Sequence, residues 1–182
     1  NANQRMIDRI TELKADTTVL FADAKDGMLG LRLAHELQIP AKEDQTFTDN
    51  KGNKTIVKGG TDKIASGNYL TSEGKTGDAA WATRGVWCKV YGKMGKDSVS
   101  ISIIDHPQNP GYPTYWHARG YGLFAANPLG QKIFSNGREQ MNLHLKKGQT
   151  ARFRYRILIE ENKHSTPVAE LNRLAADFAK TH

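Results

Sequence analysis

The sequence is poor in the residues that would cross-link the chain or hold it in a membrane. Its 182 residues include a single cysteine, Cys88, which excludes a disulfide within the chain and a cysteine-rich zinc site. No run of about eighteen apolar residues is present, so no segment is expected to span a bilayer. The 38% apolar and 25% charged residues are typical of an ordinary globular domain.

A concentrated stripe of positive charge is also missing. The net charge of +7 would suit a nucleic-acid partner, but phosphate-binding surfaces usually show a basic stripe or arm. We therefore do not expect nucleic acid as a partner. In the segment 151–159, Arg152, Arg154 and Arg156 would project from one face of a strand. This face is either solvated or, if neighbouring strands lack acidic residues, able to bind an anion or an acidic partner.

The hydrophobic pattern predicts an all-β chain. Short segments in which apolar and polar residues alternate, rich in β-branched and aromatic side chains, are typical of half-buried strands. They cover residues 6–13, 17–22, 29–34, 85–91, 98–104, 123–126, 140–145 and 150–159. Asp26-Gly27 predicts a hairpin between the second and third segments. We expect a two-sheet antiparallel β-sandwich over residues 1–162, with the large sandwich of sugar mutarotases as one form it could take.

Two segments depart from this pattern. Between residues 40 and 78 the apolar content falls, which predicts a polar, mobile insertion with a tight turn at 49–53 between two short edge strands. Thr166 and Pro167 form an N-cap and first-turn pair, so a terminal helix is expected within 163–182. Its apolar stripe would contain Val168, Leu171, Ala175 and Phe178. We expect that stripe to pack on the sandwich.

The segment from Ile103 to Pro128 combines a stiff backbone with polar and aromatic side chains. It leaves the end of the 98–104 strand, and its four prolines fix φ and favour extended geometry in the residue before each. The candidate catalytic residues are His106, His117 and Arg119. The candidate substrate-binding residues are Lys25, Arg32, Asp105, Asn109, Trp116, Tyr121 and Asn127.

These residue types favour a sugar ligand. Aromatic faces such as Trp116 can cover the C–H groups of a pyranose, while His117, Arg119 and Asn127 can hydrogen-bond its hydroxyls. Either His106 or His117 could act as general acid or base near neutral pH, with Arg119, Arg32 and Lys25 stabilising negative charge. The first alternative is a non-catalytic carbohydrate-binding or assembly module with the same site.

Two further interpretations stay open. Two imidazoles and the Asp105 carboxylate could hold a divalent metal with open positions, but their spacing is not a recognised ligand pattern, so no metal ligand is assigned and the cofactor is unknown. Alternatively, His106 and Asn109 hydrogen-bond the backbone of their own loop and His117 is a satisfied buried group. Cys88 is interpreted as a buried small hydrophobe.

Four stretches resemble a known bacterial family. They are FADAKDGMLGLRLA, WATRGVWCKVYGK, ISIIDHPQNPGYPTYWHARGYGLFAANPLG and LKKGQTARFRYRILI, which lie between about Asp23 and Ile159. Together they resemble the family of unknown function labelled methane-oxygenase PmoA-like, with Asp26 in place of the usual Glu. The label implies a metal-dependent oxygenase as a further alternative, which we disfavour because the apolar helices of the membrane-embedded enzyme are missing from this sequence.

The resemblance also implies the context of the protein. Family members are usually longer β-sandwich proteins in which the matched part forms the C-terminal half, so N-terminal strands are expected to be missing here. Unpaired sheet edges need a cover, which implies a homo-oligomer or a covering N-terminal segment or chain. The resemblance further implies a periplasmic or extracellular protein of bacteria that degrade complex carbohydrate.

Overall fold

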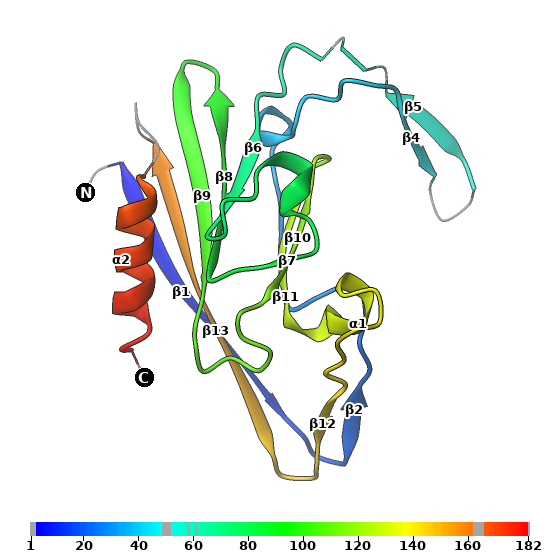
Figure 1. The fold of residues 1–182 in the computed structure, drawn as a ribbon, viewed down its shortest axis with the longest axis vertical. Coiled ribbons are helices and arrows are strands. Elements are labelled where there is room, and N and C mark those ends of the chain that lie inside the picture. Colours follow the sequence, from blue (N-terminus) through cyan, green and yellow to red (C-terminus); the bar gives the residue numbers. More distant parts are fainter. Residues whose placement is uncertain (1–2, 49–51, 58, 61, 162–165, 182) are drawn as a thin grey trace.

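The larger of two sheets contains five antiparallel strands (Figure 1). In the computed structural model, which describes residues 3–48, 52–57, 59–60, 62–161 and 166–181, they lie in the order β1-β13-β9-β8-β6. Their bounds are β1 Gln4–Lys14, β13 Thr150–Glu161, β9 Asp97–Asp105, β8 Trp87–Met94 and β6 Asn68–Thr71. The strands expected at 98–104 and 150–159 are confirmed as β9 and β13.

The smaller sheet contains four antiparallel strands in the order β3-β11-β10-β7. Their bounds are β3 Leu29–Arg32, β11 Leu123–Asn127, β10 Tyr115–Arg119 and β7 Thr83–Arg84. Two separate strand pairs complete the β structure: β2 Val19–Phe21 with β12 Leu143–Leu145, and β4 Gln45–Thr48 with β5 Lys54–Val57. The short helix α1, Gln131–Phe134, follows a 3-10 turn at Pro128–Gly130.

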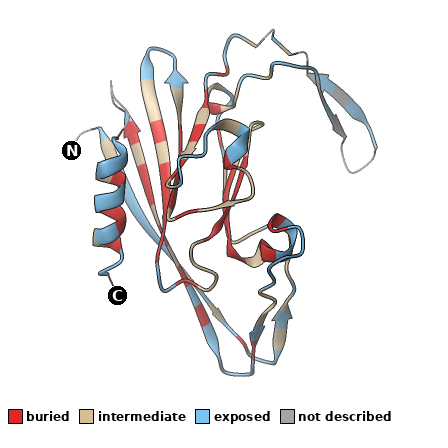
Figure 2. Ribbon diagram, in the orientation of Figure 1, coloured by how far each residue is buried: buried red, intermediate tan, exposed pale blue. Residues whose placement is uncertain are grey.

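The main hydrophobic core lies between the two sheets (Figure 2). Trp116 and Ala118 of β10 and Phe124 of β11 enter it from the smaller sheet, and Val90 and Phe153 enter it from the larger one. Side chains alternate along a strand, so the other residues of β10 project from the opposite surface of the smaller sheet. We call that surface the outer face; in β10 it carries Tyr115, His117 and Arg119.

A second core lies on the other side of the larger sheet, under helix α2, Val168–Phe178 (Figure 1). Its members are Trp87, Ile104, Leu158, Leu171, Leu174, Ala175 and Phe178. The expected terminal helix on an all-β sandwich is therefore confirmed. Its first turn differs from expectation: Pro167 is the N-cap, the Thr166 hydroxyl donates to the Glu160 carboxylate, and Val168 is 45% exposed.

The hairpin expected at Asp26-Gly27 is wrong. The segment before it, β2, pairs with β12, and the segment after it, β3, pairs with β11. Gly27 instead allows a close approach, because a Cβ at this position would lie 1.9 Å from Cγ of Asn127. The glycine is thus needed for packing between distant segments rather than for a tight turn.

The arginine face of β13 is ion-paired and only partly solvated, because the Arg156 side chain is 12% exposed and lies over the Phe178 ring of α2, at 4.5 Å. Arg156 pairs with Asp8 at 2.6 Å, and Arg152 pairs with Glu12 on the same neighbouring strand, β1. The condition set for an anion-binding face, a lack of acidic neighbours, is therefore not met. This excludes β13 as the candidate anion site.

The polar segment 40–78 contributes to two different parts of the fold. The β4-β5 hairpin extends away from the sandwich (Figure 1); the turn expected at 49–53 has its first three residues, 49–51, outside the described part. In contrast, Asn68–Thr71 forms β6 of the larger sheet, because Tyr69 and Thr71 are buried there.

Strand β1 forms one edge of the larger sheet, with β13 as its single partner among the described strands, and its Ile7 and Ile10 are about half exposed. A cover for this edge stays a prediction. Of the helices in the described ranges, none is both long enough and apolar enough to cross a membrane.

Candidate functional site

The structure divides the predicted site residues between two places. Asp105, His106 and Asn109 lie where β9 ends, between β13 and α2. His117, Arg119 and Arg32 lie on the outer face of the smaller sheet, with Lys25 and Tyr121 nearby. Two more predicted residues, Trp116 and Asn127, are enclosed by other parts of the protein.

Asp105 and Asn109 form a closed hydrogen-bond network. One oxygen of Asp105 accepts from Asn109 Nδ2 at 2.7 Å, and the other accepts the Thr114 N–H at 2.8 Å. Asn109 also donates to the Arg154 carbonyl and accepts its N–H. Burial raises the pKa of Asp105 to about 7, although both donors favour its charged form. This network ties the loop to β13, so it supports the structural interpretation of Asn109.

His106 binds the C-terminal end of α2. Its Nδ1 accepts the Gln108 N–H at 3.1 Å, so Nε2 carries the proton and donates to the Thr181 carbonyl at 3.1 Å. The ring meets Phe178 edge-on, with centroids 5.0 Å apart. Burial is the main cause that lowers the pKa of His106. Both ring nitrogens are thus used within the protein, and the placement favours a docking role over catalysis.

Trp116 and Asn127 are both fully buried. Trp116 lies in the core between the sheets, which leaves no ring face free for a pyranose. Asn127 caps the turn after β11 through the Leu129 N–H, and its Nδ2 donates to the carbonyls of Ala24 and Lys25 at 3.0 and 2.8 Å. It therefore holds the 24–25 segment on the smaller sheet, within the protein.

The outer face is arranged in rows across three strands. His117 of β10, Ala125 of β11 and Gly30 of β3 are cross-strand neighbours and form one row. The next row contains Arg119, Leu123 and Arg32. Gly30 is exposed, and a Cβ built on it would meet only Cβ of Ala125, at 3.8 Å. Gly30 and Ala125 therefore form a floor of small residues beside His117; Ala125 is buried, and the open space lies above Gly30.

His117 has an unpartnered nitrogen that lies buried beneath this surface. The residue is 2% exposed, and its Nε2 has no hydrogen-bond partner. The imidazole is hydrogen-bonded to the main chain of Lys25. Because Nε2 has no partner, we assign this hydrogen bond and the proton to Nδ1, which leaves Nε2 with a free lone pair. Burial, followed by the charges of Arg119 and Lys25, lowers the pKa of His117, while that main-chain bond and Asp26 oppose the shift. A neutral imidazole with an available acceptor is the form required of a general base.

Arg119 and Trp81 supply donors beside this acceptor. The Arg119 guanidinium lies 4.5 Å from the centre of the Trp81 ring, which fixes its orientation. The Nε of Arg119 and the Nε1 of Trp81 are both buried without a partner. Phe134 of α1 contacts both His117 and Trp81 edge-on, with centroids 5.5 and 6.0 Å away. We call the group Trp81, His117, Arg119, Arg32 and Tyr121 the outer-face cluster.

Sequence reasoning missed Phe134 and the small pair Gly30 and Ala125. The Asn127-Pro128 dipeptide is a helix-start signal that could have indicated a turn after β11. However, the contact between Phe134 and His117 depends on how that turn packs against the smaller sheet, which the local sequence does not specify. Gly30 and Ala125 become neighbours only through the pairing of β3 with β11.

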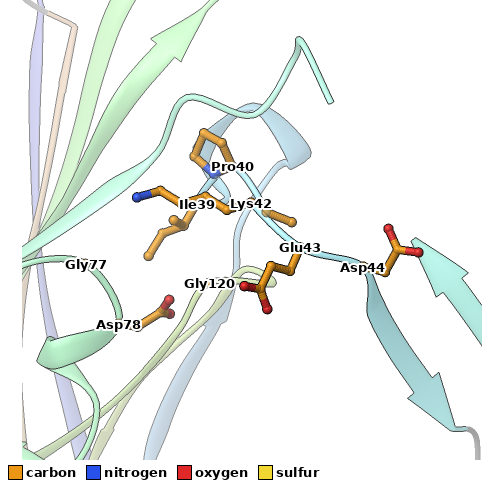
Figure 3. A pocket seen from close by; sticks show the side chains of 9 residues that line it. Ile39, Pro40, Lys42, Glu43, Asp44, Gly77, Asp78 and Gly120 are labelled. Atoms are coloured by element: carbon orange, nitrogen blue, oxygen red, sulfur yellow. The ribbon is translucent and has the colours of Figure 1, made fainter. Parts of the chain in front are cut away.

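Figure 3 shows a cavity of about 540 Å³ between the 39–44 segment, the 3-10 turn Gly77–Ala80 and Gly120. The carboxylates of Glu43 and Asp78 point toward one another across it. None of the predicted site residues lines this cavity. A second cavity, of about 370 Å³, lies between α2 and the loop that carries Asp105 and Tyr112. Within the described residues, no group of three His, Cys, Asp or Glu side chains could hold a metal ion.

Comparison with known proteins places the chain in a family. Residues 1–175 match the Family of unknown function (DUF6807). No curated protein and no solved structure matches the chain. The expectation of a family without an assigned function is thus confirmed, and the match extends beyond the 23–159 stretch. The matching family does not carry the PmoA-like label.

Proposed function

The chain belongs to the Family of unknown function (DUF6807), and for this member we propose a carbohydrate-active function centred on the outer-face cluster. The observation that carries this proposal is the unpartnered Nε2 of His117 beside the unpartnered Nε of Arg119. A buried polar group without a partner destabilises a protein by about 1–3 kcal/mol. Such a group calls for an explanation, and a ligand or a catalytic role supplies one.

A sugar satisfies both kinds of group at once. Each hydroxyl is a donor as well as an acceptor, so it can donate to Nε2 of His117 while a second oxygen accepts from Arg119 or from Nε1 of Trp81. The aromatic rings of Trp81 and Tyr121 are half-buried and add apolar surface for C–H groups. The open space above Gly30, at the edge of the small floor, is where we place the sugar ring.

In the enzymatic form of this proposal, His117 is the general base. Its neutral imidazole accepts a hydroxyl proton at Nε2 while the main chain of Lys25 orients the ring through Nδ1. Arg119 then stabilises the negative charge that develops on the sugar oxygen. In the non-catalytic form, the same contacts bind a sugar that is never changed.

The test is a thermal-shift screen of the full chain against monosaccharides and oligosaccharides, since a ligand that binds only the native state raises the melting temperature. We expect a sugar-specific shift that is lost in His117→Leu, which removes the acceptor and the buried orphan group together. Gly30→Leu should also lose the shift, because the new side chain fills the open floor. His144→Leu, at an exposed position on β12, should keep it.

Product analysis by NMR separates the two forms of the proposal. Conversion of the bound sugar by the wild type, absent in His117→Leu, supports the enzyme. Binding without conversion supports the carbohydrate-binding or assembly module. If no sugar raises the melting temperature of the folded protein, both forms of the proposal are contradicted.

The broader expectations stay proposals. The metal-dependent oxygenase, which goes with the PmoA-like label, predicts stoichiometric iron or copper in the purified protein, and elemental analysis tests this. A periplasmic or extracellular location agrees with a sugar ligand, and cell fractionation tests it. A homo-oligomer or other cover for the β1 edge is tested by light scattering.

A further inference from the structure

Resting on the proposed function, we infer that the sugar carries a carboxylate, as a uronic acid does, and that Arg119 and Arg32 of the outer-face cluster bind it. The two arginines stand in one row on either side of Leu123. Neither makes an ion pair with any residue of the described ranges. A pair of uncompensated guanidinium groups on one face is a site for an anion.

An acidic partner is common among the other arginines of the sheets and helix, although not all of them have one. Arg84 is paired with Glu139, Arg152 with Glu12, Arg156 with Asp8, and Arg173 with Glu170. Of these, Arg84 lies on the outer face itself, opposite Tyr115 of β10. Within the described ranges Arg5, Arg9 and Arg154 of the larger sheet form no ion pair either. On the outer face, Arg32 and Arg119 lie over aromatic rings, at 5.9 Å from Tyr121 and 4.5 Å from Trp81, instead of against a carboxylate.

The geometry of Arg119 suits a planar anion. Its guanidinium is held over Trp81, so its N–H groups are presented in a fixed plane. Its buried Nε–H lacks an acceptor, and the fork of guanidinium donors matches the two oxygens of a carboxylate. A carboxylate oxygen would supply the acceptor that this donor lacks.

His117 defines the rest of the ligand. Its Nε2 is an acceptor, so it requires a hydroxyl donor and would repel a second carboxylate. His117 and Arg119 are two residues apart on β10 and thus separated by roughly 7 Å along the strand. A hexose ring with a carboxylate at one end and hydroxyls at the other spans this distance, whereas a simple carboxylic acid does not. Asp26 is exposed beside Lys25, on the His117 side of the cluster, where hydroxyls bind.

The experiment is isothermal titration of the full chain, at low ionic strength, with glucuronate, galacturonate, glucose, galactose and acetate. The variants are Arg119→Gln and the matched control Arg152→Gln, which removes the same charge from an exposed position on β13. We expect a uronate to bind wild type at least about tenfold more tightly than its neutral counterpart. Arg119→Gln should weaken uronate binding about ten- to a hundredfold, and Arg152→Gln should leave it unchanged. A higher salt concentration should also weaken uronate binding to the wild type.

The other outcomes separate the two proposals. Neutral sugars that bind as tightly as uronates, with equal losses in Arg119→Gln, would overturn this inference and leave the sugar site in place. Acetate that binds as tightly as a uronate would overturn the sugar site, because the hydroxyl contacts would then contribute nothing. A folded protein that binds none of the five would overturn both. Circular dichroism of each variant establishes that it is folded.

Discussion

Asn109 occupies both main-chain hydrogen-bonding groups of Arg154: its Nδ2 donates to the Arg154 carbonyl at 2.6 Å, and its Oδ1 accepts the Arg154 N–H at 2.7 Å. The side chain thus replaces a strand neighbour at the point where β9 has ended and β13 continues. The second proton of Nδ2 goes to Asp105. Every polar atom of this amide is used to hold the proline-rich loop on the sheet.

Asn109→Ala is expected to lower the free energy of unfolding by about 2–4 kcal/mol. The substitution leaves the buried main-chain groups of Arg154 and one carboxylate oxygen of Asp105 without a partner, and each such loss amounts to about 1 kcal/mol or more. Urea unfolding measures the change. Gln108→Ala is the matched control, because it removes an exposed contact to the Arg154 side chain and should change stability by less than about 1 kcal/mol. Similar small losses in both variants would contradict a structural role for Asn109.

Asp105 should make the protein less stable as pH rises from about 4 to about 7. Burial raises its pKa from 3.8 to about 7, so the folded protein holds this proton over a range where the unfolded chain has released it. The stabilisation is fully present below the unfolded pKa and is lost as pH passes the folded one. Urea unfolding of wild type and Asp105→Asn at about pH 5 and pH 8 measures it. The stability advantage of wild type over the variant should shrink at the higher pH, and a constant advantage would count against the shift.

Gly27 and Gly30 form a matched pair for testing the packing around the outer face. Gly27→Ala would place a Cβ 1.9 Å from Cγ of Asn127, whereas Gly30→Ala would meet only Ala125, at 3.8 Å. Overpacking of this kind destabilises proteins by about 1–3 kcal/mol. We therefore expect thermal denaturation to show a clear loss for Gly27→Ala and no loss for Gly30→Ala. Equal melting temperatures for the two variants would show that the 24–27 segment does not rest on Asn127.

Sugar binding should be lost at acidic pH through His117. The proposed contact uses the free lone pair of Nε2, which protonation removes. Because burial and two neighbouring cations lower the pKa of His117 below its ordinary value of 6.5, the neutral form persists at pH 6.5 and binding should fall only at lower pH. Dissociation constants measured from about pH 4.5 to pH 8 test this. A rise in affinity on acidification, with folding intact, would rule out His117 Nε2 as the acceptor.

Local patterns predicted the elements well, because they depend on neighbours in sequence. The alternation in 98–104 and 150–159 identified β9 and β13, and helical spacing identified α2. Strand β10, Tyr115–Arg119, was not predicted, because its stretch was interpreted as part of the proline-rich loop. Only its pairing with β11 and β7 shows that His117 and Arg119 share a face. The hairpin at Asp26-Gly27 was wrong because turn chemistry is local, while the partners of β2 and β3 lie in distant parts of the chain.

The candidate site was predicted less completely. His106 and His117 are similar in sequence, as each follows a strand-like or proline-rich stretch and each is buried in the structure. They differ in the hydrogen-bond partner of Nε2. The Thr181 carbonyl accepts from Nε2 of His106, whereas Nε2 of His117 has no partner in the described structure. That difference arises from the docking of α2, which no spacing near either histidine encodes.

The sequence by itself determined the all-β class, the terminal helix and the residue types available for a site, because strand and helix periods and side-chain chemistry are local properties. Only the tertiary structure decided which of those residues meet. The pairing of β9 with β13 and the docking of α2 use the side chains of Asp105, His106 and Asn109 for hydrogen bonds that hold the fold. The pairing of β3 with β11 places Gly30 in the row of His117 and Arg32 in the next row. The physical reason is that burial and hydrogen-bond satisfaction depend on segments far apart in the chain, which the hydrophobic core brings together.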